Sequence, residues 1–177
     1  GLLHFIDWEI STFNLDSSFS FSQFTNPGFD VFLRDTLVPL CCGGKIVIPE
    51  QPDIILDGGR LAYWINVNKI NLIHCVPSLF RQINSENLSE TDFMDLRYVL
   101  LAGEKVIPSE LRNWYDKIGE RVQLVNLYGP TETTLAKTFY LIQKSDIERD
   151  VMPVGKPIRG ARVIILDENL NVCDELV

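Results

Sequence analysis

The residues with the clearest chemical potential lie between Asn126 and Thr134, in the run Asn-Leu-Tyr-Gly-Pro-Thr-Glu-Thr-Thr. This run follows an apolar stretch at residues 122–127 that is typical of a buried strand. It joins a turn-forming Gly-Pro pair to three threonine hydroxyls and the carboxylate of Glu132. Backbone amides and hydroxyls can hold phosphate oxygens, and a carboxylate can hold the accompanying Mg²⁺. The alternative is a tight turn in which the threonines bond only to their own backbone.

The elements that must position this run alternate between strand and helix. Short apolar stretches are followed by segments whose apolar side chains recur at helical spacing. Strands are predicted at residues 19–24, 46–48, 70–76, 97–101, 122–127 and 136–142, and helices at residues 2–13, 30–40, 61–67, 77–83 and 108–118. Such alternation predicts an α/β fold, in which a mainly parallel sheet is flanked by helices. Polar residues 143–153 are expected to form a loop, and residues 162–172 a β-hairpin near the C-terminus.

The predicted strands also indicate where a ligand would bind. In open parallel sheets, ligands lie beyond the carboxyl ends of the strands. We therefore expect ligand-contacting residues just after positions 24, 75, 101 and 127. The last of these positions lies within the Asn126–Thr134 run.

Length, composition and charge exclude several classes of protein. A chain of 177 residues has the length of a single domain, and its 46% of apolar residues is enough to form a buried core. Its 24 acidic and 16 basic residues give a net charge of −8 without a basic stripe, which argues against nucleic acid or an anionic membrane as partner. No apolar run approaches the roughly 20 residues of a membrane span. Four cysteines without a CxxC pair predict reduced thiols in a cytoplasmic protein.

The letters of the Asn126–Thr134 run resemble the NxYGPTE signature of adenylation domains of nonribosomal peptide synthetases. These domains belong to the adenylate-forming superfamily, together with acyl-CoA synthetases and luciferases. Further segments resemble motifs of the same family, in the same order: the FD and G-A pattern in residues 29–44, the GGE segment at 101–104, the VPIGRPI segment at 151–158 and the V-L-D run at 164–168. The resemblance covers the chain from about Ser18 onward.

This resemblance implies a flavodoxin-like subdomain and a ligase reaction. An amino acid and ATP would give an aminoacyl-AMP and pyrophosphate, with Mg²⁺ as the metal. The activated amino acid would then be loaded onto the phosphopantetheine thiol of a peptidyl carrier protein, in the biosynthesis of a secondary metabolite.

Carried over by position, the resemblance implies a nucleotide-binding set: Gly103, Asn126, Tyr128, Gly129 and Thr131. Tyr128 and Gly103 would sandwich the adenine ring, and Asn126 would bind its edge. Thr131 would contact the α-phosphate, and Glu132 would coordinate Mg²⁺. Thr131 and Glu132 are thus the implied catalytic residues.

The resemblance also implies an amino-acid pocket, in which Asp30 pairs with the α-ammonium group. Arg34 stands where the family often has Trp, and His74 would line the neighbouring wall. The remaining pocket positions are apolar: Val31, Leu100, Ala102, Leu127, Leu135 and Ala136. Because a buried Arg needs a partner, Arg34 and His74 predict a second substrate carboxylate, as in aspartate, methyl-aspartate or glutamate. If the side-chain carboxyl is adenylated, the two cations would instead hold the α-carboxylate. Alternatively, Arg34 reaches solvent or pairs with Asp35, and His74 belongs to the core.

Residues 1–177 are expected to be one core subdomain that works with the rest of an adenylation domain. The family's phosphate loop is expected before residue 1, and its ribose-binding Asp and C-terminal domain after residue 177. The chain alone is therefore expected to be inactive. One alternative is a fragment resembling an acyl-CoA synthetase, although a fatty-acid pocket has no ammonium group for Asp30 to pair with. Another alternative is a non-catalytic flavodoxin-like module, which a ligand-binding assay would distinguish.

Overall fold

The computed structural model describes residues 1–85 and 87–173. Seven strands form one sheet in the order β2-β1-β3-β4-β5-β6-β7. Their bounds are β1 (Ser20–Ser22), β2 (Lys45–Val47), β3 (Leu72–Cys75), β4 (Tyr98–Leu101), β5 (Gln123–Tyr128), β6 (Thr138–Leu141) and β7 (Lys156–Pro157). The first five strands are parallel, whereas β6 is antiparallel to β5 and β7 is antiparallel to β6. The predicted mainly parallel α/β sheet is confirmed.

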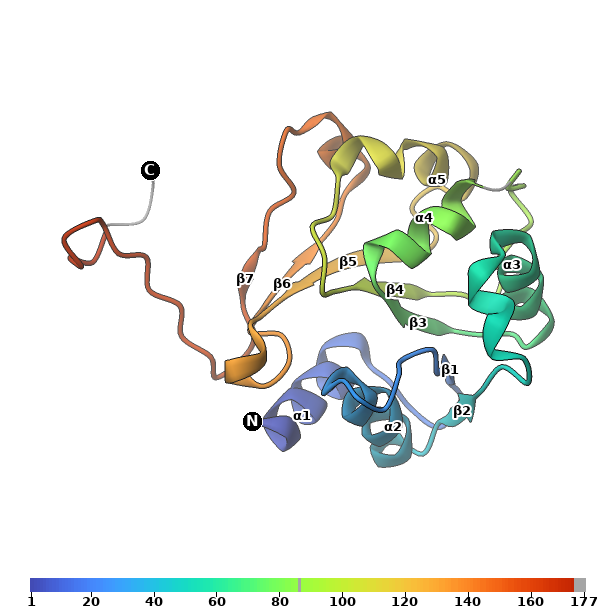
Figure 1. Ribbon diagram of the computed structural model, residues 1–177, viewed down its shortest axis with the longest axis horizontal. Coiled ribbons are helices and arrows are strands. Elements are labelled where there is room, and N and C mark those ends of the chain that lie inside the picture. The colour runs from blue at the N-terminus through green and yellow to red at the C-terminus, as the bar shows by residue number, and fades with distance from the viewer. Residues whose placement is uncertain (86, 174–177) are drawn as a thin grey trace.

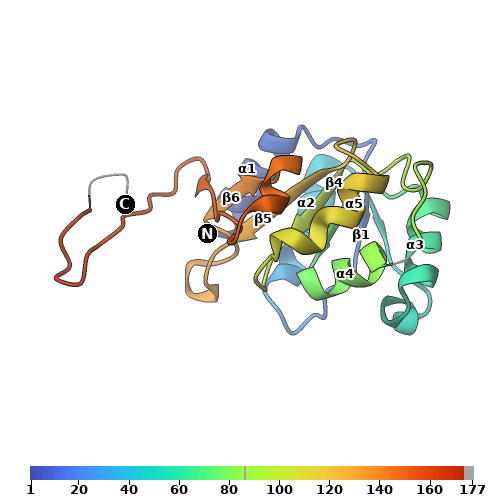
Figure 2. The ribbon, with the colours of Figure 1, turned by 90° about the horizontal axis from the view of Figure 1, so that it is seen from above.

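Helices cover both faces of the sheet (Figure 1, Figure 2). The α-helices are α1 (Leu2–Phe13), α2 (Val31–Cys42), α3 (Gly58–Val67), α4 (Pro77–Ser85) and α5 (Arg112–Lys117). Short 3₁₀ helices are η1 (Pro52–Leu56), η2 (Pro108–Leu111), η3 (Thr131–Thr133) and η4 (Lys144–Glu148). Helices α1 and α2 lie on one face, and α3, α4 and α5 lie on the other. The result is a three-layer arrangement with one core on each side of the sheet.

Aromatic side chains pack against one another in both cores. Beneath α1 and α2, Trp8 packs on Phe139 of β6 with a distance of 5.0 Å between ring centroids. On the opposite face, Trp114 of α5 contacts both Phe80 of α4 and Phe93, at centroid distances of 5.0 and 5.4 Å. Aromatic pairs in such tilted or stacked geometry stabilise a core beyond their buried area.

The structure differs from the sequence prediction in several segments. The helix expected at residues 108–118 is the 3₁₀ helix η2 followed by α5, and the loop expected at 143–153 contains η4. A capping box between Gln143 and Asp146 satisfies the amides that begin η4, which polar composition alone does not reveal. In the segment expected to form the C-terminal hairpin, one antiparallel bridge joins Leu166 to Val172. Figure 1 shows this segment running away from the sheet.

Strand order places a natural crevice in this fold. The parallel strands have the order 2-1-3-4-5, so the chain reverses its direction of progress across the sheet between β1 and β3. Ligands of open α/β sheets bind at such a reversal, because the loops on either side of it diverge. In the described residues, no helix has the length and apolar character needed to cross a bilayer.

Candidate functional site

A cavity of about 600 Å³ opens at the carboxyl ends of the parallel strands. The segments that follow β1, β3, β4 and β5 line it, together with part of η1. These are the segments after positions 24, 75, 101 and 127 that the predicted strands indicate. The cavity therefore lies at the strand reversal and contains parts of several motifs.

The cavity lining includes a carboxylate. Asp30 is the residue before α2, and its Oδ2 lies 3.4 Å from the backbone nitrogen of Leu135, which donates to it. An anion is stabilised at this position by the positive end of the helix dipole. Asp30 is only partly buried and lines the cavity beside Val31. It is therefore placed to pair with a cationic group inside the cavity.

Apolar side chains form the neighbouring wall. Four of the expected pocket residues line the cavity there: Ala102, Leu127, Leu135 and Ala136. Leu100, the other apolar position expected there, does not line it. Leu100 points to the same face of β4 as Ala102 but lies two residues deeper in the strand, where the α1–α2 core buries it completely. The structure thus corrects the expected placement of Leu100.

The structure also corrects the expected placement of Arg34, which does not line the cavity. Its side chain is 1% exposed, and its Nε donates to Oε2 of Glu9 at 2.9 Å while Nη2 donates to Oε1 of the same carboxylate. Nη1 donates to Oδ1 of Asp35 at 2.9 Å. Burial lowers the pKa of Arg34, but the carboxylates of Glu9 and Asp35 outweigh it and raise the pKa above its ordinary value. Arg34 is a buried cation paired with two carboxylates, and the alternative that it pairs with Asp35 is confirmed.

His74 does line the cavity, and Asp35 fixes its ring. Nδ1 of His74 lies 3.1 Å from Oδ1 of Asp35, whose Oδ2 accepts a bond from the Thr25 hydroxyl. Burial raises the pKa of Asp35, but His74 and Arg34 outweigh it and hold the pKa below its ordinary value. Because an ionised carboxylate can only accept, Nδ1 must carry the hydrogen. Within the described chain, Nε2 has no hydrogen-bond partner and remains for a ligand.

The turn that was predicted to hold phosphate also contributes to the cavity. Gly129 and Thr131 of this turn line the cavity, together with Gly103. Gly103 has a φ of +87°, a conformation that favours glycine. A Cβ on Gly129 would lie 2.4 Å from the carbonyl oxygen of Leu135, so only glycine fits there without displacing the next loop.

Three residues of the implied nucleotide and metal set lie outside the cavity lining. Tyr128 is 56% exposed, and Glu132 is exposed beside Thr131. Asn126 is buried, and its Nδ2 donates to the carbonyl of Pro153 at 2.8 Å. Their roles stay predictions. An exposed carboxylate next to a phosphate-type turn suits Mg²⁺, which usually keeps several waters and bridges one or two carboxylates to substrate phosphates.

The loop after this turn is conformationally strained. Thr134 and Leu135 have consecutive positive φ values of 65° and 58°. Non-glycine residues in this region cost about 1–3 kcal/mol each and cluster at binding sites. The ammonium of Lys137 donates to the carbonyl of Thr134 at 2.7 Å and helps to hold the loop. The strain therefore lies in the segment that also bonds to Asp30.

Two features of the cavity were not identified as ligand contacts from sequence. Glu104 accepts bonds from the backbone nitrogen and the hydroxyl of Ser78, both at 2.9 Å, so it joins the end of β4 to the start of α4. Its position directly after a predicted strand end was the available signal. Ile55 and Leu56 of η1 also line the cavity, and nothing in their local pattern indicates this.

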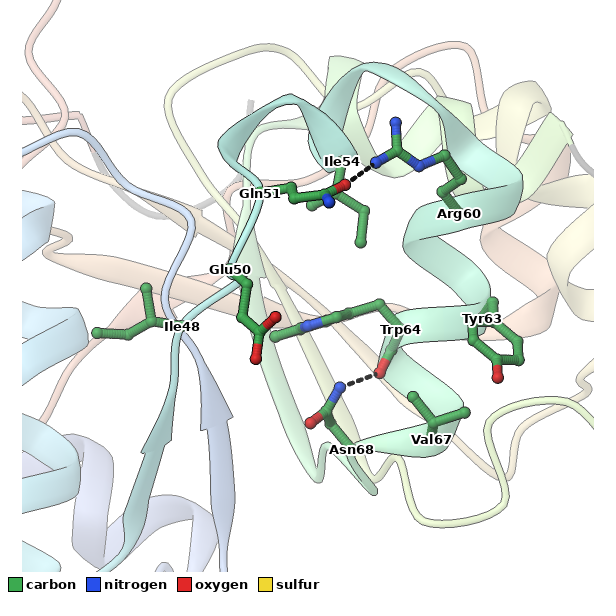
Figure 3. A pocket seen from close by; sticks show the side chains of 9 residues that line it. All are labelled: Ile48, Glu50, Gln51, Ile54, Arg60, Tyr63, Trp64, Val67 and Asn68. Carbon is green, nitrogen blue, oxygen red and sulfur yellow. Dashed lines mark hydrogen bonds between the residues drawn. The ribbon is translucent and has the colours of Figure 1, made fainter.

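A second, smaller cavity of about 380 Å³ lies beyond β2, at the edge of the sheet (Figure 3). Trp64 and Glu50 both form part of its lining. Arg60 is paired with Gln51 at 2.6 Å and with Asp53 at 3.2 Å. This cavity shares no lining residue with the larger one and includes none of the motif residues.

Comparison with known families identifies the family of the chain. The family described as AMP-binding enzyme matches residues 2–175. The chain belongs to this family. The adenylate-forming family expected from the sequence motifs is confirmed.

Relatives of the AMP-binding family include both synthases and reductases. The chain is 33% identical over 150 residues to syringomycin synthase SyrB1 of Pseudomonas syringae pv. syringae, covering 84% of this chain and 24% of that protein. It is 25% identical over 176 residues to L-2-aminoadipate reductase of Saccharomyces cerevisiae, covering 96% of this chain and 12% of that protein. The chain thus spans less than a quarter of the length of these relatives.

Solved structures show the same fold. The Vibrio cholerae adenylation domain AlmE, in complex with glycyl-adenosine-5'-phosphate, aligns with a TM-score of 0.80 at 19% identity, over 95% of this chain and 31% of that one. Holo-PA1221, a nonribosomal peptide synthetase protein containing adenylation and PCP domains, aligns with a TM-score of 0.78 at 28% identity, over 90% and 27% of the two chains. The fold of this chain is that of the core of adenylation domains.

Proposed function

We propose that this chain forms the amino-acid-selecting part of an adenylation domain. The domain would convert an amino acid and ATP into an aminoacyl-AMP and pyrophosphate. It would then load the amino acid onto the phosphopantetheine thiol of a carrier protein. The observation that carries this proposal is one cavity that is lined both by the Asp30 carboxylate and by the turn residues Gly129 and Thr131.

The residues that line the cavity suit both halves of an aminoacyl-AMP. Asp30 would pair with the α-ammonium group, and the apolar wall would contact the side chain. The glycine turn and Thr131 would receive the phosphate, because backbone amides and hydroxyls can approach phosphate oxygens closely there. Tyr128 and Gly103 would hold the adenine, and Glu132 would bind Mg²⁺.

The comparisons support this proposal at the level of chemistry. AlmE is described in complex with glycyl-adenosine-5'-phosphate, which is an aminoacyl-AMP. Holo-PA1221 contains a PCP domain beside its adenylation domain, which supports a carrier protein as the acceptor. The presence of Asp30 at the cavity favours an amino acid over a fatty acid, because a fatty acid offers no cation to pair with it.

The main argument for an acidic amino acid as the substrate does not hold in this geometry. That expectation depended on two cations, Arg34 and His74, facing the substrate. Arg34 is bonded to Glu9 and Asp35 instead, so only His74 stands at the wall. We therefore propose an amino acid without restricting it to the acidic class.

Binding of non-hydrolysable aminoacyl-AMP mimics tests the proposal directly. Isothermal titration of the 177-residue chain with a panel of aminoacyl-sulfamoyladenosines should detect at least one ligand. Asp30→Asn should weaken that ligand by about tenfold or more, since a hydrogen bond involving a charged group contributes roughly 1.5–3 kcal/mol. Asp53→Asn removes an exposed carboxylate that pairs with Arg60, a residue of the smaller cavity, and should leave the affinity unchanged. Absence of binding by every mimic, or equal effects of the two variants, would contradict the proposal.

A further inference from the structure

We propose that Glu9 determines which side chains the cavity accepts, because it cancels the charge of Arg34 and so disfavours acidic amino acids. Glu9 lies on α1 and does not line the cavity. It would act as a positioning and charge-balancing residue. The inference rests on the proposed function, since it concerns the side-chain selectivity of the same cavity.

The placement of Glu9 is unusual for a carboxylate. Its side chain is 0% exposed, and it lies on the buried face of α1 together with Phe5, Trp8 and Phe13. Charged side chains are rarely buried to this extent unless they are paired. Both carboxylate oxygens of Glu9 accept from Arg34, which is the bidentate geometry of a strong ion pair.

The pairing of Glu9 with Arg34 sets the net charge of the buried cluster formed by Glu9, Arg34, Asp35 and His74. Two carboxylates, Glu9 and Asp35, face one guanidinium, Arg34, so these three groups sum to −1. The imidazole of His74 adds zero or one positive charge, and the cluster total is then −1 or 0. The wall of the cavity near His74 therefore carries no net positive charge with which to attract an anionic side chain.

Arg34 is nevertheless close enough to influence the cavity. Asp35 Oδ1 accepts from both Arg34 and His74, so a single carboxylate oxygen separates the guanidinium from a cavity-lining ring. Charges in a buried setting are weakly screened by salt and water. Removal of the Glu9 charge would raise the cluster total by one, to 0 or +1, and would favour a substrate carboxylate beside His74.

The test compares isosteric ligands that differ only in charge. Glutamyl- and glutaminyl-sulfamoyladenosine are titrated into the chain and into Glu9→Gln, and the ratio of their dissociation constants is recorded. A general loss of stability lowers both affinities alike and leaves the ratio unchanged. We expect the unmodified chain to prefer the glutaminyl ligand, and Glu9→Gln to shift the ratio by about tenfold toward the glutamyl ligand. Glu9→Asp keeps the charge and should leave the ratio within about threefold.

A double variant keeps the inference testable if Glu9→Gln fails to fold, as an unpaired buried guanidinium can cause. Glu9→Gln combined with Arg34→Gln leaves the total charge of the cluster unchanged. Its ratio should therefore equal that of the unmodified chain, with circular dichroism confirming the fold. A drop of more than tenfold in glutamyl binding relative to glutaminyl binding would show that Arg34 serves the substrate and would overturn the inference. An unchanged ratio in a folded Glu9→Gln chain, or a glutamyl preference in the unmodified chain, would also overturn the inference.

If neither these ligands nor any other mimic binds the unmodified chain, the proposed function fails and the inference fails with it.

Discussion

Replacement of Gly129 by alanine should displace the loop that lines part of the cavity. A Cβ there would lie 2.4 Å from the carbonyl oxygen of Leu135, 2.7 Å from the Cα of Ala136 and 2.8 Å from the nitrogen of Lys137. All three are backbone atoms, so no side-chain rotation relieves the overlap. Because overpacking of this kind costs about 1–3 kcal/mol, and about 1 kcal/mol corresponds to roughly 2–4 °C in a chain of this size, we expect the melting temperature to fall by about 2–12 °C.

Gly119→Ala is the matched control, because it separates steric overlap from backbone strain. Gly119 has a φ of +70°, but no atom lies within 4 Å of the position that a Cβ would occupy, so alanine there meets strain without a clash. Left-handed backbone costs about 1–2 kcal/mol per residue, part of which the stiffer unfolded chain offsets. Differential scanning calorimetry would compare the two variants, and titration with an aminoacyl-AMP mimic would report on the cavity.

The two variants should therefore diverge in binding more than in stability. Gly129→Ala should weaken the mimic by about tenfold or more, because the displaced loop includes Leu135, which lines the cavity and donates to Asp30. Gly119→Ala should bind as the unmodified chain does. If Gly129→Ala melts within about 1 °C of the unmodified chain and binds the mimic equally well, the close backbone contact does not determine the cavity.

Three further results are expected. Phe21→Ala should cost about 3–5 kcal/mol in the free energy of unfolding by denaturant, because Phe21 is completely buried. Exposed Phe29→Ala should change this free energy by less than about 0.5 kcal/mol. Equal costs would contradict the burial of Phe21 in the core beneath α1 and α2. Burial raises the pKa of Asp146, but the Gln143 amide and the Arg149 guanidinium outweigh burial and lower the pKa, so the stabilisation by ionised Asp146 is present above about pH 4 and is lost as the pH falls further. The melting temperatures at pH 6 and pH 3 should therefore differ less in Asp146→Asn than in the unmodified chain. An equal difference in the two proteins would refute this role of Asp146. Burial raises the pKa of Cys75, so a thiol reagent at pH 8 should label exposed Cys41 first and Cys75 only on unfolding, as mass spectrometry of peptides would show.

The sequence was informative wherever a local pattern decided the structure. Helical spacing of apolar residues placed α1 at its observed bounds, Leu2–Phe13. The apolar run around Ile73 indicated a strand buried on both faces, as β3 is. The alternation of strand and helix then predicted which strand ends meet, and hence where the cavity lies.

Prediction from sequence failed where a distant partner decides the outcome. Arg34 and Glu9 are separated by 25 positions, and the packing of α1 against α2 brings them together. A signal was present, because Glu9 stands among the apolar residues of α1 and a carboxylate on a buried face requires a cation. The position of Leu100 shows a different limit, since its depth within β4 depends on how far α1 and α2 extend over the strand.

The ion pair between Glu9 and Arg34 has a consequence for how such cavities diversify. A substitution at Arg34 alone would leave a buried carboxylate on α1 without its counter-ion, and a substitution at Glu9 alone would leave an unpaired guanidinium. We therefore expect related sequences to change positions 9 and 34 together, although of α1 and α2 only α2 borders the cavity. Transfer of α2, which borders the cavity, into another adenylation domain would move Arg34 without Glu9. Glu9 of α1 has to be transplanted with α2 for the receiving protein to keep its balance of charge.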